Sequence, residues 1–417
     1  MSSPSSAPQL WVLNAVALVG TMAIMAFVAV VGPVVRILGL EDWHAGLSLT
    51  VGGVLWMLAA RRWGKLSDRV GRRRVLLISL SAYAITYVVM ALSVDMALTS
   101  PPAMALSLLI LVGSRALVGL FYAAVPAITA ASVADQVAPQ HRASAMAKLG
   151  AANAVGLVAG PVVAGWIALY DIAWSLYAAA LMPVLALVLI AWKLPETYAG
   201  NKSGNKAGNK PGAVPTPGQP GLGWRDPRLR LPLFAVFTAM IAVAVTQSTV
   251  GFLVLDRMQL SLSEGAKTAG YALTAVGSGL ILSQSMMMRI TWPPERWLLL
   301  GAVLAGSGFG AVALLESAEP MLAAFGLAGI GMGMVRPAVQ ALTANCVEAH
   351  EQGEAAGMVA SMQGLSMVVG PLAGTLLYRI SPGTPYVLVL ILLMLLAVAV
   401  WRYQSAEVSQ RGTGVTS

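Results

Sequence analysis

Twelve apolar runs, each near the ~20 residues that a helix needs to cross a membrane, constrain the fold of this chain more than any other feature. Because the runs are continuously apolar and do not alternate, they predict helices and exclude a barrel. Hydrophobic residues make up 58% of the chain and charged residues 10%, far from the composition of a soluble domain. The sequence therefore predicts an all-α membrane protein with transmembrane helices near 10–35, 44–60, 75–94, 103–133, 145–168, 173–193, 231–254, 267–288, 297–315, 320–345, 355–377 and 384–403.

The spans form two halves separated by residues 194–230. This stretch repeats Asn-Lys-x-Gly three times and then becomes rich in Pro and Gly, which predicts a flexible cytoplasmic linker. The pair Gly160-Pro161 recurs as Gly370-Pro371, and Pro126 is matched by Pro337, which favours parallel six-helix repeats. We expect six-helix bundles at 1–193 and 231–403, with a cytoplasmic tail at 404–417.

The positive charges set the expected orientation. Most of the 26 Lys and Arg residues fall in loops on the side that holds both termini, whereas the acidic residues show no such bias. The net charge of +9 is explained by these loops, so no nucleic-acid partner is expected. Short loops and the lack of a targeting segment suggest a bacterial inner (plasma) membrane protein, multi-pass, with both termini cytoplasmic.

Several function classes are excluded by composition. A single cysteine and three scattered histidines offer no metal-ligand spacing, and the spans contain no carboxylate pair or nucleophile with a base. No phosphate-binding glycine loop is present, so ATP is not the expected energy source. We expect no enzyme activity, no metal and no cofactor.

The most specific local pattern joins the second and third spans. The residues G-K-L-S-D-R-V-G-R-R-R, from Gly64 to Arg74, place two glycines, one carboxylate and several guanidiniums in what we expect to be a tight cytoplasmic turn. With twelve spans, this G-x-x-x-D-R-x-G-R-R pattern resembles the signature of the major facilitator superfamily. The motif residues are Gly64, Asp68, Arg69, Gly71, Arg72 and Arg73.

The resemblance implies that this motif forms a cytoplasmic charge lock that breaks and re-forms as the bundles move. Asp68 would then face the start of the eleventh helix, near Gly353 to Gly357, where the helix dipole favours a carboxylate. Asp135, at the end of the fourth span, is a further expected member. The corresponding loop of the second half, around Arg289 to Arg296, lacks the motif, so the lock is expected on one side only.

A second pattern lies in the fifth span. Gly156, Gly160 and Gly165 recur around Pro161, and small residues at this spacing let helices approach closely while proline bends the helix. The pattern resembles the motif G-x-x-x-G-P-x-x-G-G of the exporter branch of the same superfamily, with Ala164 in place of one glycine. Ordinary helix packing is the alternative interpretation.

Two arginines fall inside predicted helices. Arg115, followed by Gly119, resembles the family's R-x-x-x-G element, in which the arginine assists proton coupling. A guanidinium inside a membrane is costly, so a structural arginine bonded to helix carbonyls is the alternative. Arg336, just before Pro337, matches no motif, and a functional charge and an arginine reaching for the membrane surface are both consistent with its position.

Acidic residues and histidines are missing from the centres of all predicted spans. The expected charge at a substrate cavity is therefore positive, which favours an anionic or polar-neutral substrate over a lipophilic cation. The proton carrier is left open among Asp42, His44 and Asp256 near span ends. The expected cavity or coupling residues are Arg115, Arg336, Asn14, Gln247 and Gln363.

These features favour a proton-coupled secondary exporter that works by alternating access, driven by the proton gradient and monomeric as the family is. The expected partners are a small-molecule substrate and the lipid bilayer. The favoured substrate is a polar or anionic metabolite such as a siderophore. Multidrug efflux is the alternative, and a nutrient importer or uniporter is less favoured because of the fifth-span motif.

Overall fold

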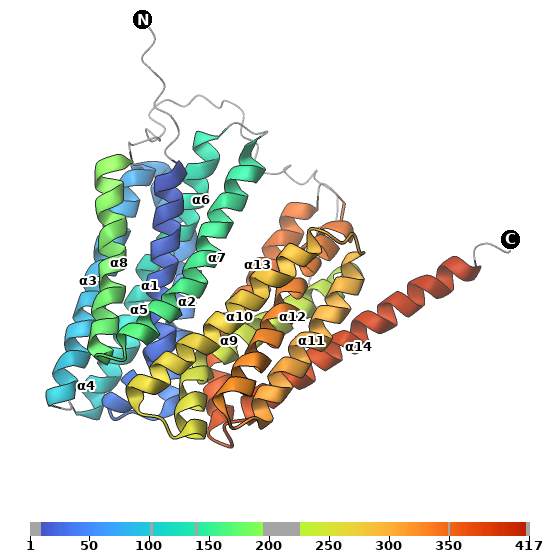
Figure 1. Ribbon diagram of the computed structural model, residues 1–417. Coiled ribbons are helices and arrows are strands. Elements are labelled where there is room, and N and C mark those ends of the chain that lie inside the picture. The colour runs from blue at the N-terminus through green and yellow to red at the C-terminus, as the bar shows by residue number, and fades with distance from the viewer. Residues whose placement is uncertain (1–9, 101–102, 138–140, 195–225, 349–350, 414–417) are drawn as a thin grey trace, which may run out of the picture. The chain divides into compact units, whose positions relative to one another are not determined.

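The computed structural model describes residues 10–100, 103–137, 141–194, 226–348 and 351–413. Within these residues the chain is helical and contains no strand. The expected linker at 194–230 lies almost entirely outside the described residues, as do residues 1–9 of the N-terminus. The predicted all-α fold with twelve membrane-length segments is confirmed (Figure 1).

The first half of the chain begins with α1 (Leu10–Ile37), α2 (Asp42–Val70) and α3 (Arg72–Thr99). The fourth span is a series of α4 (Met104–Leu108), a π-helical turn η1 (Leu109–Gly113), α5 (Ser114–Tyr122) and α6 (Ala124–Gln136). Two further helices, α7 (Arg142–Ile167) and α8 (Ile172–Lys193), complete this half.

The second half begins with a short 3-10 turn η3 (Pro227–Leu229) that leads into α9 (Arg230–Met258). It continues with α10 (Leu262–Met287), α11 (Pro294–Leu314), α12 (Ala318–Asn345), α13 (Gln352–Tyr378) and α14 (Thr384–Thr413). The last helix runs ten residues past the expected end of the span at 403.

Eleven segments in the described part of the chain are long and apolar enough to cross a membrane. The helix missing from this set is α10, which is 26 residues long but interrupts its apolar residues with glycine, serine and threonine. Its length still matches a span, since 26 residues rise about 39 Å.

Contacts divide the chain into two compact units. Unit 1 comprises Met1–Gly204 and Val250–Thr274, and unit 2 comprises Asn205–Thr249 and Ala275–Ser417. The end of α9 and the start of α10 thus group with the first half of the chain. The expected bundles at 1–193 and 231–403 stay a prediction.

In unit 1, α1 is the central helix. It packs against α7, α8, α6 and α2, while α3 packs against α8 and α5 (Figure 1). Most of the α1 side chains are buried, which fits the composition of the helix, because it carries no charged residue before Arg36. In unit 2, α11 packs against α12 and α14, and α13 against α12 and α14.

The expected turn at 64–74 is wrong in its extent. The second helix continues as α2 through Val70, and only Gly71 separates it from α3. Gly71 has φ +114° and ψ 145°, a backbone conformation open almost only to glycine. Residues 61–70 contain no proline and only one glycine, Gly64, so the helix can continue and the turn is compressed into a single residue.

Gly71→Ala is expected to lower the free energy of unfolding by about 1–3 kcal/mol, because a Cβ is strained at this positive φ. Gly64→Ala is the matched control, since a Cβ at Gly64 would meet nothing within 4 Å. The thermal midpoints of the two purified variants in detergent test this. Equal midpoints would contradict the assigned backbone role of Gly71.

Candidate functional site

Arg115 is buried in the interior of unit 1, with a relative exposure of 6%. It is the second residue of α5 and follows the π-helical turn η1 directly, and such turns inside helices are frequent at functional sites. Its guanidinium carbon lies 4.4 Å from the centre of the Phe27 ring on α1, a cation–π contact.

Two of the three guanidinium nitrogens of Arg115, Nε and Nη1, are buried without a hydrogen-bond partner in the described part of the chain. The structural alternative, an arginine held by helix carbonyls, therefore does not account for these two donors. A buried donor without a partner costs about 1–3 kcal/mol, more when charged. The described residues thus leave two buried donors of Arg115 without an acceptor.

Glycines hold the helices close at this arginine. A Cβ on Gly119 would lie 2.0 Å from the carbonyl oxygen of Gly52 on α2, and a Cβ on Gly52 would lie 2.9 Å from the carbonyl oxygen of Arg115. Any larger side chain would push α2 away from α5. The spacing R-x-x-x-G thus has a local cause, because Gly119 lies one turn beyond Arg115 on the same face.

A hydrogen-bonded chain joins three helices of unit 1. Thr21 on α1 donates from Oγ1 to Oδ1 of Asn153 on α7 at 2.7 Å, while Nδ2 of Asn153 donates to the carbonyl of Leu149 at 3.1 Å. The Thr21 hydroxyl lies 3.0 Å from the Tyr122 hydroxyl on α5. Since Thr21 has one hydrogen and gives it to Asn153, the Tyr122 hydroxyl is the donor in that contact.

Two aromatic rings contact the Tyr122 ring. The Tyr122 ring centre lies 5.4 Å from those of Tyr83 on α3 and Trp56 on α2, and Trp56 is 38% exposed. Thr21, Tyr122 and Asn153 are not recognisable as a group in the sequence, because they lie on three helices that come together only in the folded protein. The polar spacing of Arg115 and Tyr122, seven residues apart on one helix face, was the available signal.

In the motif from Gly64 to Arg74, Arg72 forms ion pairs with two carboxylates. It is 8% exposed and pairs with Asp68 through Nη1 at 2.5 Å and with Asp135 through Nε at 3.1 Å. Nη1 also donates to the Ser67 hydroxyl at 2.6 Å. The structure thus brings Asp68, Arg72 and Asp135 together within unit 1. The expected position of Asp68 opposite the start of the eleventh helix stays a prediction.

The other motif residues have separate surroundings. Arg73 donates from Nη2 to the carbonyl of Ala191 on α8 at 2.8 Å, which ties the start of α3 to the end of α8. Arg69 is exposed at the end of α2, and Gly64 has open space around it.

The fifth-span motif lines two helix contacts. Cβ atoms on Gly156 and Gly160 would each lie 2.5 Å from a carbonyl oxygen of α1, those of Leu18 and Met22. On the next turn, a Cβ on Gly165 would lie 2.9 Å from the carbonyl oxygen of Ala266, at the start of α10. A Cβ on Gly270, also in α10, would lie 2.7 Å from the carbonyl oxygen of Pro161. All four motif residues thus lie at backbone-to-backbone contacts.

The remaining predicted cavity residues fall into two groups. Arg336 on α12 and Gln363 on α13 line one cavity of unit 2. Asn14 on α1 and Gln247 on α9 are half-buried, and neither lines that cavity.

The three candidate proton carriers lie at helix ends of unit 1. Asp256, near the end of α9, forms an ion pair with Arg36 at the end of α1. His44 is buried, and its Nδ1 accepts a hydrogen bond of 3.0 Å from the backbone N–H of Glu41. Asp42 is the first residue of α2. Within the described residues, no three His, Cys, Asp or Glu side chains form a group that could hold a metal ion.

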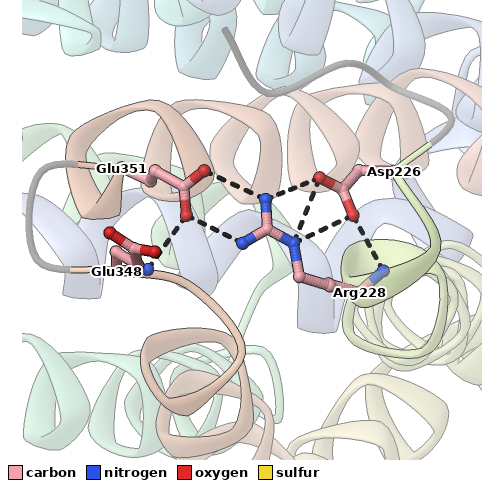
Figure 2. Close-up of polar contacts among 4 residues, drawn as sticks. All are labelled: Asp226, Arg228, Glu348 and Glu351. Atoms are coloured by element: carbon pink, nitrogen blue, oxygen red, sulfur yellow. Dashed lines mark hydrogen bonds and ion pairs between the residues drawn. The ribbon is translucent and has the colours of Figure 1, made fainter. Parts of the chain in front are cut away.

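Unit 2 carries a charge cluster that the sequence analysis missed. Figure 2 shows Arg228, at the start of the second half, between Asp226 and Glu351. The guanidinium donates to both oxygens of Glu351 at 2.9 and 3.0 Å and to Asp226 Oδ2 at 2.9 Å. Glu351 also accepts the backbone N–H of Glu348 at 2.9 Å. We call these four residues the Arg228 clasp.

The Arg228 clasp connects the residue stretch before α9 to the loop before α13. Beside it in the sequence, Leu229 and Leu233 pack with Val347, Ala355 and Met358 in a small buried apolar cluster. The clasp and the cluster together fix the ends of α9, α12 and α13, which are the helices that form the cavity of unit 2.

The pKa of Asp226 lies below its ordinary value because the Arg228 side chain, and then the Arg228 backbone N–H, donate hydrogen bonds to its carboxylate. Because the pKa is lower in the folded state, the carboxylate stabilises the fold at pH values above the pKa of an unfolded Asp, which is about 3.9. This contribution is lost as the pH falls through the lower, folded value.

Wild type is therefore expected to unfold at a higher temperature than Asp226→Asn at pH 7, by a modest margin because the half-exposed Arg228 is screened by solvent. The margin should shrink as the pH falls below about 4. Thermal unfolding in detergent from pH 7 to pH 3 measures it. A margin that stays constant over this range would contradict the assigned ion pair.

The eleven described helices that are long and apolar enough to cross a membrane, with α10 of matching length, define a multi-pass α-helical membrane protein. The sequence matches the Major Facilitator Superfamily profile over residues 10–319 and 265–416. Tetracycline resistance protein class G of Vibrio anguillarum is 30% identical over 354 residues, with 82% of each chain covered. Solute carrier family 67 member A1 of Homo sapiens is 28% identical, with 84% of this chain and 81% of that protein covered.

Solved structures agree on the fold. The human organic anion transporter MFSD10 (TETRAN) superposes with a TM-score of 0.61 at 20% identity, covering 95% of this chain and all of that one. A bacterial homolog of the human lysosomal transporter Spinster gives a TM-score of 0.70 at 15% identity, covering 96% and 97%. The chain belongs to the major facilitator superfamily, as the motif from Gly64 to Arg74 predicts.

Proposed function

We propose that this protein is a proton-coupled exporter of small molecules with anionic or polar character. The observation that carries the proposal is the buried guanidinium of Arg115, whose Nε and Nη1 have no hydrogen-bond partner among the described residues. An unsatisfied cation inside a transporter is retained at a cost in stability, which a role in binding or coupling explains.

The direction of transport rests on two observations. The glycines around Pro161 match the exporter pattern in three of its four glycine positions, and each of these three lies at a close helix contact. Among the relatives, tetracycline resistance proteins of classes G and C are 30% and 29% identical to this chain. A membrane transporter gives resistance most simply by removing the drug from the cell, so these names favour export.

For the substrate, the same relatives favour a drug over the siderophore that the sequence analysis proposes. The positive charges of Arg115 and Arg336, with no acidic residue at the centre of a span, support an anionic or polar-neutral molecule in either case. We propose tetracycline as the first compound to test, and a siderophore-like polar metabolite as the second. A nutrient importer or uniporter is the third hypothesis.

The proposed mechanism is alternating access driven by the proton gradient, by a monomer in a bacterial inner membrane with both termini in the cytoplasm. Arg115 assists coupling, and the motif around Arg72 is the cytoplasmic charge lock. The proton carrier is one of Asp42, His44 and Asp256, of which Asp256 is ion-paired with Arg36.

Everted membrane vesicles from cells that produce the protein test the proposal. Labelled tetracycline is expected to accumulate inside them when a proton gradient is imposed, and a protonophore should abolish the accumulation. Arg115→Ala should reduce initial uptake by about ten- to a hundredfold, the loss expected for hydrogen bonds to a charged group. Arg402→Ala, which removes an exposed arginine of α14, is the control and should transport normally.

Several results would contradict parts of this account. Unchanged transport by Arg115→Ala would remove the role of that arginine, and uptake only into right-side-out vesicles would favour an importer. If tetracycline is not moved, small molecules inside and outside iron-limited cells with and without the gene should be compared. A polar chelator retained inside cells that lack the gene would then support siderophore export.

A further inference from the structure

An open pocket lies at the surface of unit 2, between α9, α12 and α13, and two of its polar side chains, Arg336 and Gln340, are exposed. Its wall is mostly apolar, and three longer polar side chains enter it. The apolar lining consists of Val236, Ala239, Met240, Val335, Val339 and Val359, and the polar lining of Arg336, Gln340 and Gln363. We call this the Arg336 pocket.

Helical spacing separates the two kinds of lining. Arg336 and Gln340 lie one turn apart on the same face of α12, and Gln363 lies on α13. The contribution of α9, which includes Val236 and Met240, is apolar and buried. The pocket therefore has a polar side on α12 and α13 and an apolar side on α9.

The polar side chains of the Arg336 pocket are not used by the protein itself. Among the described residues, Arg336, Gln340 and Gln363 form no hydrogen bond or ion pair with another residue, and no carboxylate lines the pocket. Arg72 and Arg228, in contrast, each bind two carboxylates. Arg336 thus combines a full positive charge with the absence of a protein counter-charge.

An arginine that only reaches for the membrane surface does not account for this arrangement. Such an arginine requires no amide groups around it, whereas Gln340 and Gln363 enter the same cavity from two helices. Polar side chains within a span are costly unless they pair or bind something. Their convergence on one cavity indicates a ligand.

We propose that the Arg336 pocket binds the carboxylate, or an equivalent planar anionic group, of an amphipathic small molecule. The planar fork of a guanidinium matches the two oxygens of a carboxylate, and the glutamine amides supply further donors. Beside them, the apolar part of the pocket, where the half-buried Val359 is the most accessible valine, faces the apolar end of the same molecule. This inference rests on the proposed export function and narrows its substrates to amphipathic anions.

The test uses two probes of equal shape, 2-naphthoate and its neutral amide 2-naphthamide, with the full chain purified in detergent. Binding is measured by isothermal titration calorimetry. Wild type should bind the acid about ten- to a hundredfold more tightly than the amide, as expected for a charge-assisted pair. In Arg336→Gln the ratio should fall to about one, whereas Arg336→Lys should keep part of it because the charge remains.

Two controls keep the result interpretable. Arg289→Gln removes an arginine of the second half outside the pocket and should keep the wild-type ratio. Thermal midpoints of all variants show whether Arg336→Gln is folded. If it is not, Gln363→Ala replaces it, with the expectation that binding of the acid weakens while the midpoint stays near that of wild type.

The outcomes separate this inference from the proposed function. Wild type that binds acid and amide equally, or an unchanged ratio in Arg336→Gln, would overturn the Arg336 pocket as an anion site, even if tetracycline is transported into everted vesicles. A ratio that depends on Arg336 would support the pocket, even if the vesicles move no tetracycline and the export proposal fails.

Discussion

A guanidinium inside a membrane is costly unless it forms an ion pair, forms hydrogen bonds or binds a ligand. The arginines of this protein meet this requirement in different ways. At the helix ends, arginines are neutralised: Arg72 binds Asp68 and Asp135, and Arg228 binds Asp226 and Glu351. Inside the spans, Arg115 keeps two nitrogens without a partner, and among the described residues Arg336 has no bonded partner at all. The arginines at the helix ends are therefore paired with carboxylates, whereas the two arginines inside the spans form no ion pair with a described residue.

The helices around these charges are positioned by small residues. In unit 1, Gly119 and Gly52 bring α5 against α2 beside Arg115, and Gly156 and Gly160 bring α7 against α1. In unit 2, a Cβ on Gly329 of α12 would lie 2.2 Å from the carbonyl oxygen of Val276 on α10. Lipid supplies no hydrophobic force between helices, so close backbone packing takes its place. Rigid helix pairs of this kind keep a charged side chain where its donors can meet a ligand.

Hydropathy was enough to predict the fold, because each membrane span must satisfy its backbone within one helix. The motif glycines were also visible in the sequence. Gly71 is required by its own positive φ, whereas Gly119 and Gly160 are required by close contacts with neighbouring helices. The sequence could not show contacts that depend on how the helices pack. These are the hydrogen bonds among Thr21, Tyr122 and Asn153, the Arg228 clasp, and the pocket that Gln340 and Arg336 share with Gln363. The apolar run of the second span ends near residue 60, whereas α2 continues as a helix through charged residues to Val70. The π-helical turn before Arg115 has no sequence signal that we recognise.

The central claim is that Arg115 is retained for function at a cost in stability. The most direct measurement is the thermal unfolding of Arg115→Met in detergent without substrate, since methionine keeps the length and apolar contacts of the side chain but removes its buried donors. The account predicts that this variant is more stable than wild type by about 1–3 kcal/mol, the cost of an unsatisfied buried polar group, while it no longer transports. A variant less stable than wild type would contradict the account and assign Arg115 a structural role.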